Sequence, residues 1–135
     1  MGKILILSDF FEIRELISEE FSPEGHMVVS TGQLSLFKEL LTVLDPDVVL
    51  LDLHLKKASV WSVNHLIRKK SPRLSVLPFT AYPNTDGNIR LVIAHPEGGE
   101  NLSFQAFKQK MNILLNPNLS SQQGKSGEQR LNPES

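Results

Sequence analysis

The strongest constraint on the fold is an unbroken apolar run, Val48–Leu51, that is followed directly by Asp52. The run is too short for a helix and turn-forming residues flank it, which predicts a strand buried on both faces, as in a parallel sheet. In open α/β sheets the functional site lies just outside the carboxyl ends of the strands. Asp52 is therefore a candidate site residue, although a single aspartate in this place also fits a simple turn cap.

The rest of the chain alternates between two patterns. A second buried-strand pattern lies at residues 3–7, a short outer strand at 26–30 and a further strand at 74–79. Apolar residues at helical spacing fill residues 12–21, 36–44, 59–70 and 104–115. This alternation predicts an α/β protein with right-handed crossovers and helices on both faces of the sheet. We expect a flavodoxin-like, doubly wound, five-stranded parallel sheet in the order 2-1-3-4-5.

The segment after the fourth strand is harder to interpret. Residues 81–88 are dense in turn formers, so we expect the fourth helix to be shortened or replaced by a loop. The β-branched character of residues 89–95 favours a fifth strand there, although residues 86–95 could instead form a poor helix and the strand could lie nearer 97–100. We expect one domain over residues 1–115 and a flexible polar tail or linker over 116–135.

Composition excludes several classes of function. The chain has no cysteine, which excludes disulfides, thiolate catalysis and zinc sites built on cysteine. Its formal net charge of -1 provides no basic field for nucleic acid, so no nucleic-acid partner is expected. The sequence contains no apolar run long enough for a membrane span and no recognisable signal peptide, so we expect a cytoplasmic protein with no membrane partner.

Polar residues follow three of the predicted strands. Ser8 and Asp9 follow the first, Asp52 ends the third, and Thr80 ends the fourth. The order 2-1-3-4-5 would bring these strand ends together in one shallow pocket. Two close carboxylates repel one another, and the usual relief is a bound divalent cation or protonation of one carboxylate. Oxygen ligands with open positions suit Mg²⁺, and an aspartate beside that ion could attack a phosphoryl donor.

Several stretches carry a resemblance to a known family, and they lie at residues 3–9, 13–16, 25–26, 46–53, 66–68 and 79–82. Over residues 3–115 the chain resembles the receiver domain of bacterial two-component response regulators. The resemblance implies that Asp52 is the phosphoacceptor and that Asp9 is a direct Mg²⁺ ligand. It also implies that the backbone carbonyl of His54 is a further ligand and that Thr80 is the switch hydroxyl.

The chain departs from the family pattern around the acidic site. Ser8 stands where the family has the first of two acids, which weakens one Mg²⁺ contact that is normally made through water. In the loop after Asp52, Lys56 and Val60 stand where proline and glycine are common. These replacements put the geometry of the loop and the strength of Mg²⁺ binding in question.

A second departure concerns the family's lysine, which follows strand five and precedes a proline. If the fifth strand is 89–95, His95 occupies this slot as a possible replacement; if the last helix anchors the alignment, Glu100 does. The aromatic switch residue of strand five is also missing, with Val92 or Glu97 in its place.

Two functions are compatible with these residues. The first is a receiver that accepts a phosphoryl group on Asp52, with Mg²⁺, from a histidine kinase or phosphotransfer protein, and then changes its affinity for a downstream protein partner. Its switching is expected to be impaired or unusual. The alternative is a pseudo-receiver, a protein-interaction module that signals without phosphorylation. Neither is an enzyme in the conventional sense.

Two further features have simple interpretations at this level. Lys69 and Lys70 close the third predicted helix and are most simply solvated charge, as are Lys56 and Lys57. Trp61, on the same helix, is interpreted as a packing residue or a partner contact rather than a cofactor platform.

Overall fold

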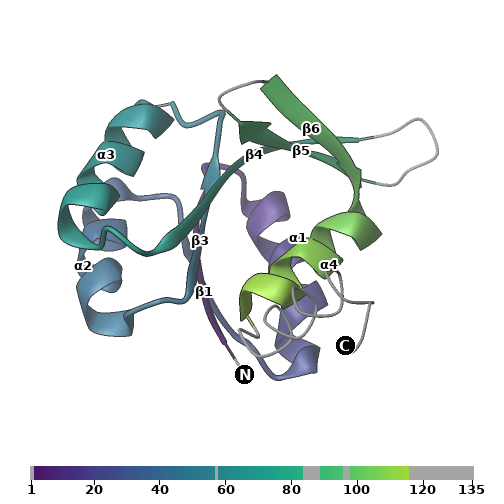
Figure 1. The fold of residues 1–135 in the computed structure, drawn as a ribbon, viewed down its shortest axis with the longest axis horizontal. Coiled ribbons are helices and arrows are strands. Elements are labelled where there is room, and N and C mark those ends of the chain that lie inside the picture. Colours follow the sequence, from purple (N-terminus) through teal and green to yellow (C-terminus); the bar gives the residue numbers. More distant parts are fainter. Residues whose placement is uncertain (1, 57, 84–88, 96–97, 116–135) are drawn as a thin grey trace, which may run out of the picture.

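The computed structural model describes residues 2–56, 58–83, 89–95 and 98–115, and between residues 82 and 104 it describes the backbone alone. In this part of the chain one six-stranded sheet has the order β2-β1-β3-β4-β5-β6. The strands are β1 (Lys3–Leu7), β2 (Met27–Thr31), β3 (Val48–Asp52), β4 (Ser75–Pro83), β5 (Ile89–His95) and β6 (Gly98–Ser103). The predicted doubly wound α/β fold and the placement of β5 beside β4 are confirmed (Figure 1).

β3, the strand predicted from the apolar run Val48–Leu51, lies inside the sheet. β3 is parallel to β1 on one side and to β4 on the other, and all five of its residues are buried. A strand covered on both faces needs apolar residues at every position rather than at alternate ones. This is why an unbroken apolar run marks the centre of the sheet.

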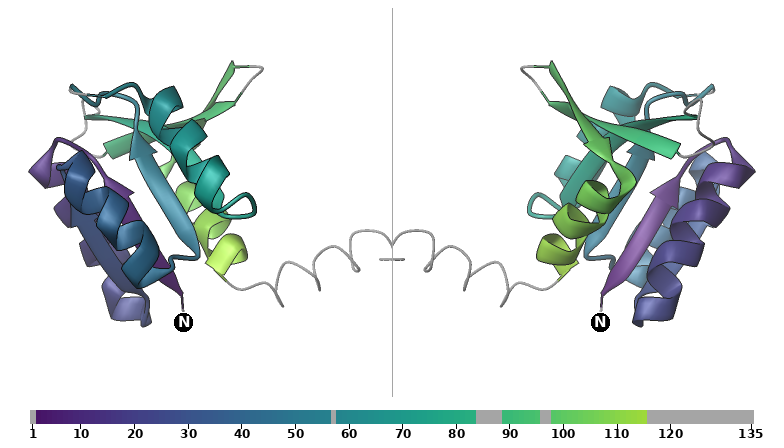
Figure 2. Two further views of the ribbon diagram at one scale, coloured as in Figure 1. Left: turned by 90° about the vertical axis from the view of Figure 1, so that its left-hand side faces the viewer. Right: turned by 90° about the vertical axis from the view of Figure 1, so that its right-hand side faces the viewer.

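The helices cover both faces of the sheet in pairs. They are α1 (Phe11–Phe21), α2 (Leu34–Leu44), α3 (Val60–Lys70) and α4 (Phe104–Leu115), and a short 3-10 helix, η1 (Ser22–Glu24), follows α1. α1 and α4 lie on one side of the sheet, and α2 and α3 lie on the other (Figures 1 and 2). Each pair encloses its own core, one built around Phe21 and Phe107 and the other around Phe37 and Ile67.

Local sequence signals explain where the helices begin and end. The side chain of Ser59 caps α3 by accepting hydrogen bonds from the backbone N–H groups of Trp61 and Ser62. Arg68, Lys69 and Lys70 occupy the last turn of α3, where positive charge interacts favourably with the negative end of the helix dipole. After α1 and η1, Gly25 has a φ of 94°, a left-handed conformation that glycine adopts without a steric penalty.

The end of the sheet corrects the predicted architecture. β5 does span Ile89–His95, so the helical alternative for this segment is wrong, and no helix lies between β4 and β5 among the residues that the structure describes. However, β5 runs antiparallel to β4, and a sixth strand, Gly98–Ser103, runs antiparallel to β5. The sheet is therefore not the five-stranded parallel sheet that the sequence predicted. Only residues 84–88 separate β4 from β5, too few for the crossover that a parallel strand requires.

α4 is described as far as Leu115, and the domain boundary predicted at this residue stays a prediction. Residues 116–135, predicted to be a flexible tail, lie outside the described residues. Among the helices that the structure describes, none has the length and apolar character that would allow it to cross a membrane.

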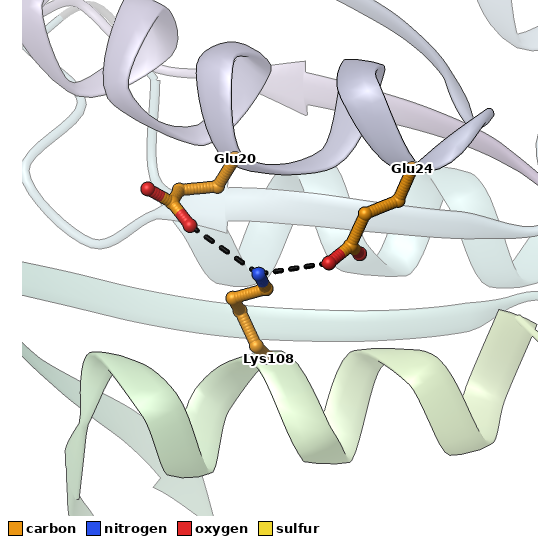
Figure 3. A network of polar contacts seen from close by, with 3 residues as sticks. All are labelled: Glu20, Glu24 and Lys108. Atoms are coloured by element: carbon orange, nitrogen blue, oxygen red, sulfur yellow. Dashed lines mark ion pairs between the residues drawn. The ribbon is translucent and has the colours of Figure 1, made fainter.

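An ion-pair network fastens α4 to the end of α1 and to η1 (Figure 3). The ammonium group of Lys108 lies 2.9 Å from a carboxylate oxygen of Glu24 and 3.4 Å from one of Glu20. The Lys108 side chain is only 19% exposed, whereas the two glutamates are about 40% exposed. The hydrogen bond to Glu24 is the main reason that the pKa of Lys108 is raised above its ordinary value of 10.5.

We predict that Lys108→Met lowers the free energy of unfolding by about 0.5–1 kcal/mol at neutral pH, in the range measured for surface ion pairs. Because the folded-state pKa of Lys108 is raised, the contribution is fully present below pH 10.5 and is lost as the pH rises through the folded-state value. Urea unfolding of wild type and variant at neutral and strongly alkaline pH measures this difference. An equal loss of stability at both pH values would show that the effect comes from packing rather than charge.

Candidate functional site

The candidate site lies at the carboxyl edge of β1 and β3, two neighbouring parallel strands inside the sheet. Ser8 and Asp9 follow β1 directly, and Asp52 is the last residue of β3. Ser8 is fully buried and Asp52 is 2% exposed, so this edge holds a carboxylate that is almost completely removed from water. A buried carboxylate needs hydrogen-bond donors from the protein.

Asp52 has those donors on both of its oxygens. The hydroxyl of Ser8 donates to Oδ2 at 2.6 Å, and the backbone N–H of His54 donates to Oδ1 at 2.9 Å. A hydroxyl–carboxylate contact of this length is a charge-assisted hydrogen bond. The Ser8 hydroxyl also accepts a bond from the backbone N–H of Phe10 at 3.2 Å. The Ser8 hydroxyl is thus used to hold Asp52.

Asp9 is held from the other loop. The backbone N–H of Lys56 donates to Oδ2 of Asp9 at 2.6 Å, which ties the β3–α3 loop to the end of β1. Proline, which is common in the family at the position of Lys56, has no N–H and could not make this bond. The ammonium group of Lys56 lies 5.9 Å from the centroid of the Phe10 ring, within the range of a cation–π contact.

Arg14 on α1 fixes the β1–α1 loop. Its guanidinium donates to the backbone carbonyl of Ser8 at 2.6 Å and lies 5.7 Å from the centroid of the Phe11 ring. Gly32 in the β2–α2 loop packs against the same place, because a Cβ there would lie 3.0 Å from Nη1 of Arg14 and 3.2 Å from the carbonyl oxygen of Ser8. The sequence placed Gly32 in a turn and gave Arg14 no contact in the site; the one signal for Arg14 is that it follows Phe11 by three residues on a helix.

Thr80 lies at the same level of the sheet. It follows Phe79, the residue of β4 that pairs with Asp52. Thr80 is 4% exposed, and its hydroxyl oxygen has no hydrogen-bond partner among the described residues. A buried hydroxyl without a partner costs free energy, so it is a group that a ligand or a rearranged side chain could satisfy.

The backbone register removes His95 from the position expected for it. Val92 pairs with Thr80 and Ile93 pairs with Phe79, so β5 runs from the carboxyl edge toward the amino end of β4 before it reaches His95. The His95 backbone therefore lies away from the carboxyl edge, and its role as a lysine-slot replacement stays a prediction. The reason is strand direction: a residue that ends a parallel strand lies at the carboxyl edge, and one that ends an antiparallel strand does not.

A pocket of about 450 Å³ opens beside the acidic residues on the side of α2. Asp9 and Lys56 line it, together with Leu7, Gly32, Gln33, Leu34, Ser35, Leu55 and Ala58. Of the two aspartates, Asp9 is the one that reaches this space. Asp52 does not line this pocket and is hydrogen-bonded to Ser8.

The side chains at this edge do not fit a Mg²⁺ ion as they are arranged. Both oxygens of Asp52 and one oxygen of Asp9 accept hydrogen bonds from the protein. No group of three His, Cys, Asp or Glu side chains that could hold a metal ion occurs within the described residues. An ion that demands near-octahedral oxygen coordination would compete with the Ser8 hydroxyl and the Lys56 amide for the oxygens of these carboxylates. The metal-ligand roles predicted for Asp9, Asp52, Ser8 and the His54 carbonyl remain predictions.

The fold of the chain is similar to that of several solved structures. No protein-family model and no curated protein matches the sequence. A chain in the crystal structure of the histidine kinase ThkA in complex with the response regulator protein TrrA matches with a TM-score of 0.66 and 24% identity, and the match covers 86% of this chain and 100% of that one.

Two receiver domains match over shorter lengths. The non-phosphorylated HemR receiver domain from Leptospira biflexa has a TM-score of 0.56 and 24% identity, over 64% of this chain and 69% of that one. The receiver domain of TorR, the response regulator of the TMAO respiratory system, has a TM-score of 0.53 and 20% identity, over 58% of this chain. This chain spans 64% of the TorR domain, less than two thirds of its length. These matches confirm that the chain has the receiver-domain fold.

We predict that Ser8→Ala lowers the free energy of unfolding by about 1.5–3 kcal/mol, because it removes a hydrogen bond to a buried charged group. Urea unfolding at neutral pH measures the loss. In a double-mutant cycle with Asp52→Ala, the cost of Ser8→Ala should fall to a small fraction of its value, because the group that it serves is gone. An unchanged cost in the Asp52→Ala background would contradict the interaction.

Proposed function

We propose that this chain is a receiver-type signalling module whose acidic site is closed by hydrogen bonds from the protein, and that it acts by binding partner proteins without requiring phosphorylation. The observation that carries the proposal is the 2.6 Å hydrogen bond from the Ser8 hydroxyl to Oδ2 of Asp52. The receiver-domain fold of the solved structures that match the chain supports the signalling class.

Both Asp52 and Asp9 accept hydrogen bonds from donors of the protein itself. In the receivers that the chain resembles, two acids lie beside the aspartate that corresponds to Asp52, and a divalent cation relieves the repulsion between these carboxylates. Here a neutral serine replaces one acid and donates to Asp52, and the Lys56 amide donates to Asp9. Fewer negative charges and more donors reduce the attraction for Mg²⁺, so we propose that its affinity is weak.

A second candidate function is phosphoryl acceptance on Asp52, and the unpartnered hydroxyl of Thr80 favours it. In that reaction an Asp52 oxygen would form a bond to phosphorus while the bond between phosphorus and the donor breaks. Ser8 would first have to release Oδ2, and Thr80 would donate to a phosphoryl oxygen. This order of events makes the Ser8 bond a barrier to the reaction.

The partners follow from the class of protein. A histidine kinase or phosphotransfer protein is the expected donor for the second candidate, and a histidine kinase accompanies the response regulator in the ThkA–TrrA structure. For both candidates the output is contact with a downstream protein, in the cytoplasm, without a nucleic-acid or membrane partner. Neither candidate is an enzyme in the conventional sense.

We predict that wild type binds Mg²⁺ weakly and that Ser8→Asp binds it at least about tenfold more tightly, because the substitution removes the donor to Asp52 and restores the second acid. A Mg²⁺ titration with and without beryllofluoride, a mimic of the phosphoryl group, followed by amide chemical shifts of Asp9, Asp52 and Thr80, measures both affinities. Asp52→Asn serves as the control that should abolish the response to beryllofluoride.

The same titration separates the two candidates. A beryllofluoride response that requires Ser8→Asp supports the closed site. Saturable beryllofluoride shifts in wild type at millimolar Mg²⁺, lost in Asp52→Asn, would overturn the phosphorylation-independent proposal and establish phosphoryl acceptance instead.

A further inference from the structure

An open pocket of about 610 Å³ lies between α2 and α3, on the side of the sheet opposite α1 and α4. One of its walls is Lys38 of α2. The others come from one side of α3, and they are Ser62, His65, Leu66, Lys69 and Lys70. We call this pocket, defined by these six residues, the α2–α3 groove.

The groove concentrates positive charge. Three of its residues are exposed lysines and none is acidic, although the whole chain has a formal net charge of -1. Within the described residues, Lys38, Lys69 and Lys70 take part in no ion pair. Lys69 and Lys70 also serve the dipole of α3, but Lys38 lies within α2 and has no such role.

The groove also offers apolar contact. Leu66 is half-buried between the lysines, and the long methylene stems of lysine add apolar surface. Trp61, which precedes Ser62 of the groove, is 57% exposed. Trp61 is therefore not a core residue, and this exposure is compatible with the partner contact that the sequence suggested. Exposed aromatic residues are enriched at protein interfaces.

We propose that the α2–α3 groove binds an acidic segment of a partner protein. Carboxylates of the segment pair with Lys38 on one wall and with Lys69 and Lys70 on the other, and an apolar side chain of the segment packs on Leu66. A short peptide matches the groove better than a nucleic acid, because the net negative charge of the rest of the chain opposes the extended phosphate contacts on which nucleic-acid binding depends.

The groove is distinct from the acidic site. Asp52 lies at the carboxyl edge of β3, whereas Lys69 and Lys70 lie in the last turn of α3, which runs away from that edge. A partner bound in the groove therefore leaves Ser8 and Asp52 uncovered. The inference rests on the proposed function, since it names the chemistry of the partner that a protein-binding module would take.

The test uses a short amphipathic peptide of glutamate and leucine as the probe and its lysine-for-glutamate counterpart as the charge control. Trp61 is the single tryptophan of the chain and reports binding by its fluorescence, and the anisotropy of a labelled peptide gives an independent readout. We expect saturable binding of the acidic peptide, weakened about 2- to 5-fold by each of Lys38→Gln and Lys69→Gln and further by added salt.

Lys110→Gln is the matched control, because it removes one positive charge from α4 on the opposite side of the sheet and should leave the affinity unchanged. Equal affinity of wild type and Lys38→Gln/Lys69→Gln would overturn the proposal. So would tighter binding of single-stranded DNA than of the acidic peptide, or self-association through the groove in place of peptide binding. Peptide binding and the Mg²⁺–beryllofluoride titration are separate readouts, and Lys38→Gln and Lys69→Gln leave Ser8 and Asp52 intact, so failure here is distinguishable from failure of the closed-site proposal.

Discussion

The structure depends on how one buried carboxylate is satisfied. Asp52 ends the strand at the centre of the sheet and is almost fully removed from water. A charged group in that place is tolerated only when the protein or a ligand supplies compensating interactions. Here the protein supplies them on both oxygens, from the Ser8 hydroxyl and the His54 amide. The chemistry of the site follows from this arrangement, because every ligand of Asp52 must compete with these donors.

The neighbouring loops are organised by the same requirement. Ser8 is positioned by its own bonds to Phe10 and to Arg14, and Asp9 is tied to the β3–α3 loop through Lys56. Two of the departures from the receiver pattern act in the same direction, since Ser8 and Lys56 each add a donor. We interpret them as one coherent modification of the site rather than as two independent losses.

Much of this could be predicted from the sequence. The periodicity of apolar residues located the central strand and the helices of both faces, and the predicted strand order placed the ends of β1 and β3 side by side. The direction of β5 was predicted wrongly, although residues 84–88 are too few for a parallel crossover. The hydrogen bond from Lys56 to Asp9 could not be predicted, because a backbone amide leaves no mark in the sequence. The α2–α3 groove could not be predicted for another reason. Its residues come from two helices, and the sequence does not show that these helices place their lysines around one pocket.

The most direct test of the closed site is observation of the Ser8 hydroxyl proton by NMR at neutral pH. Because Ser8 is fully buried and donates a 2.6 Å bond, its hydroxyl proton should exchange slowly with water and give a resolved resonance. That resonance should be lost in Asp52→Ala and should persist in wild type when millimolar Mg²⁺ is added. Absence of the resonance in wild type, or its disappearance on addition of Mg²⁺, would contradict a site that is closed by the protein itself.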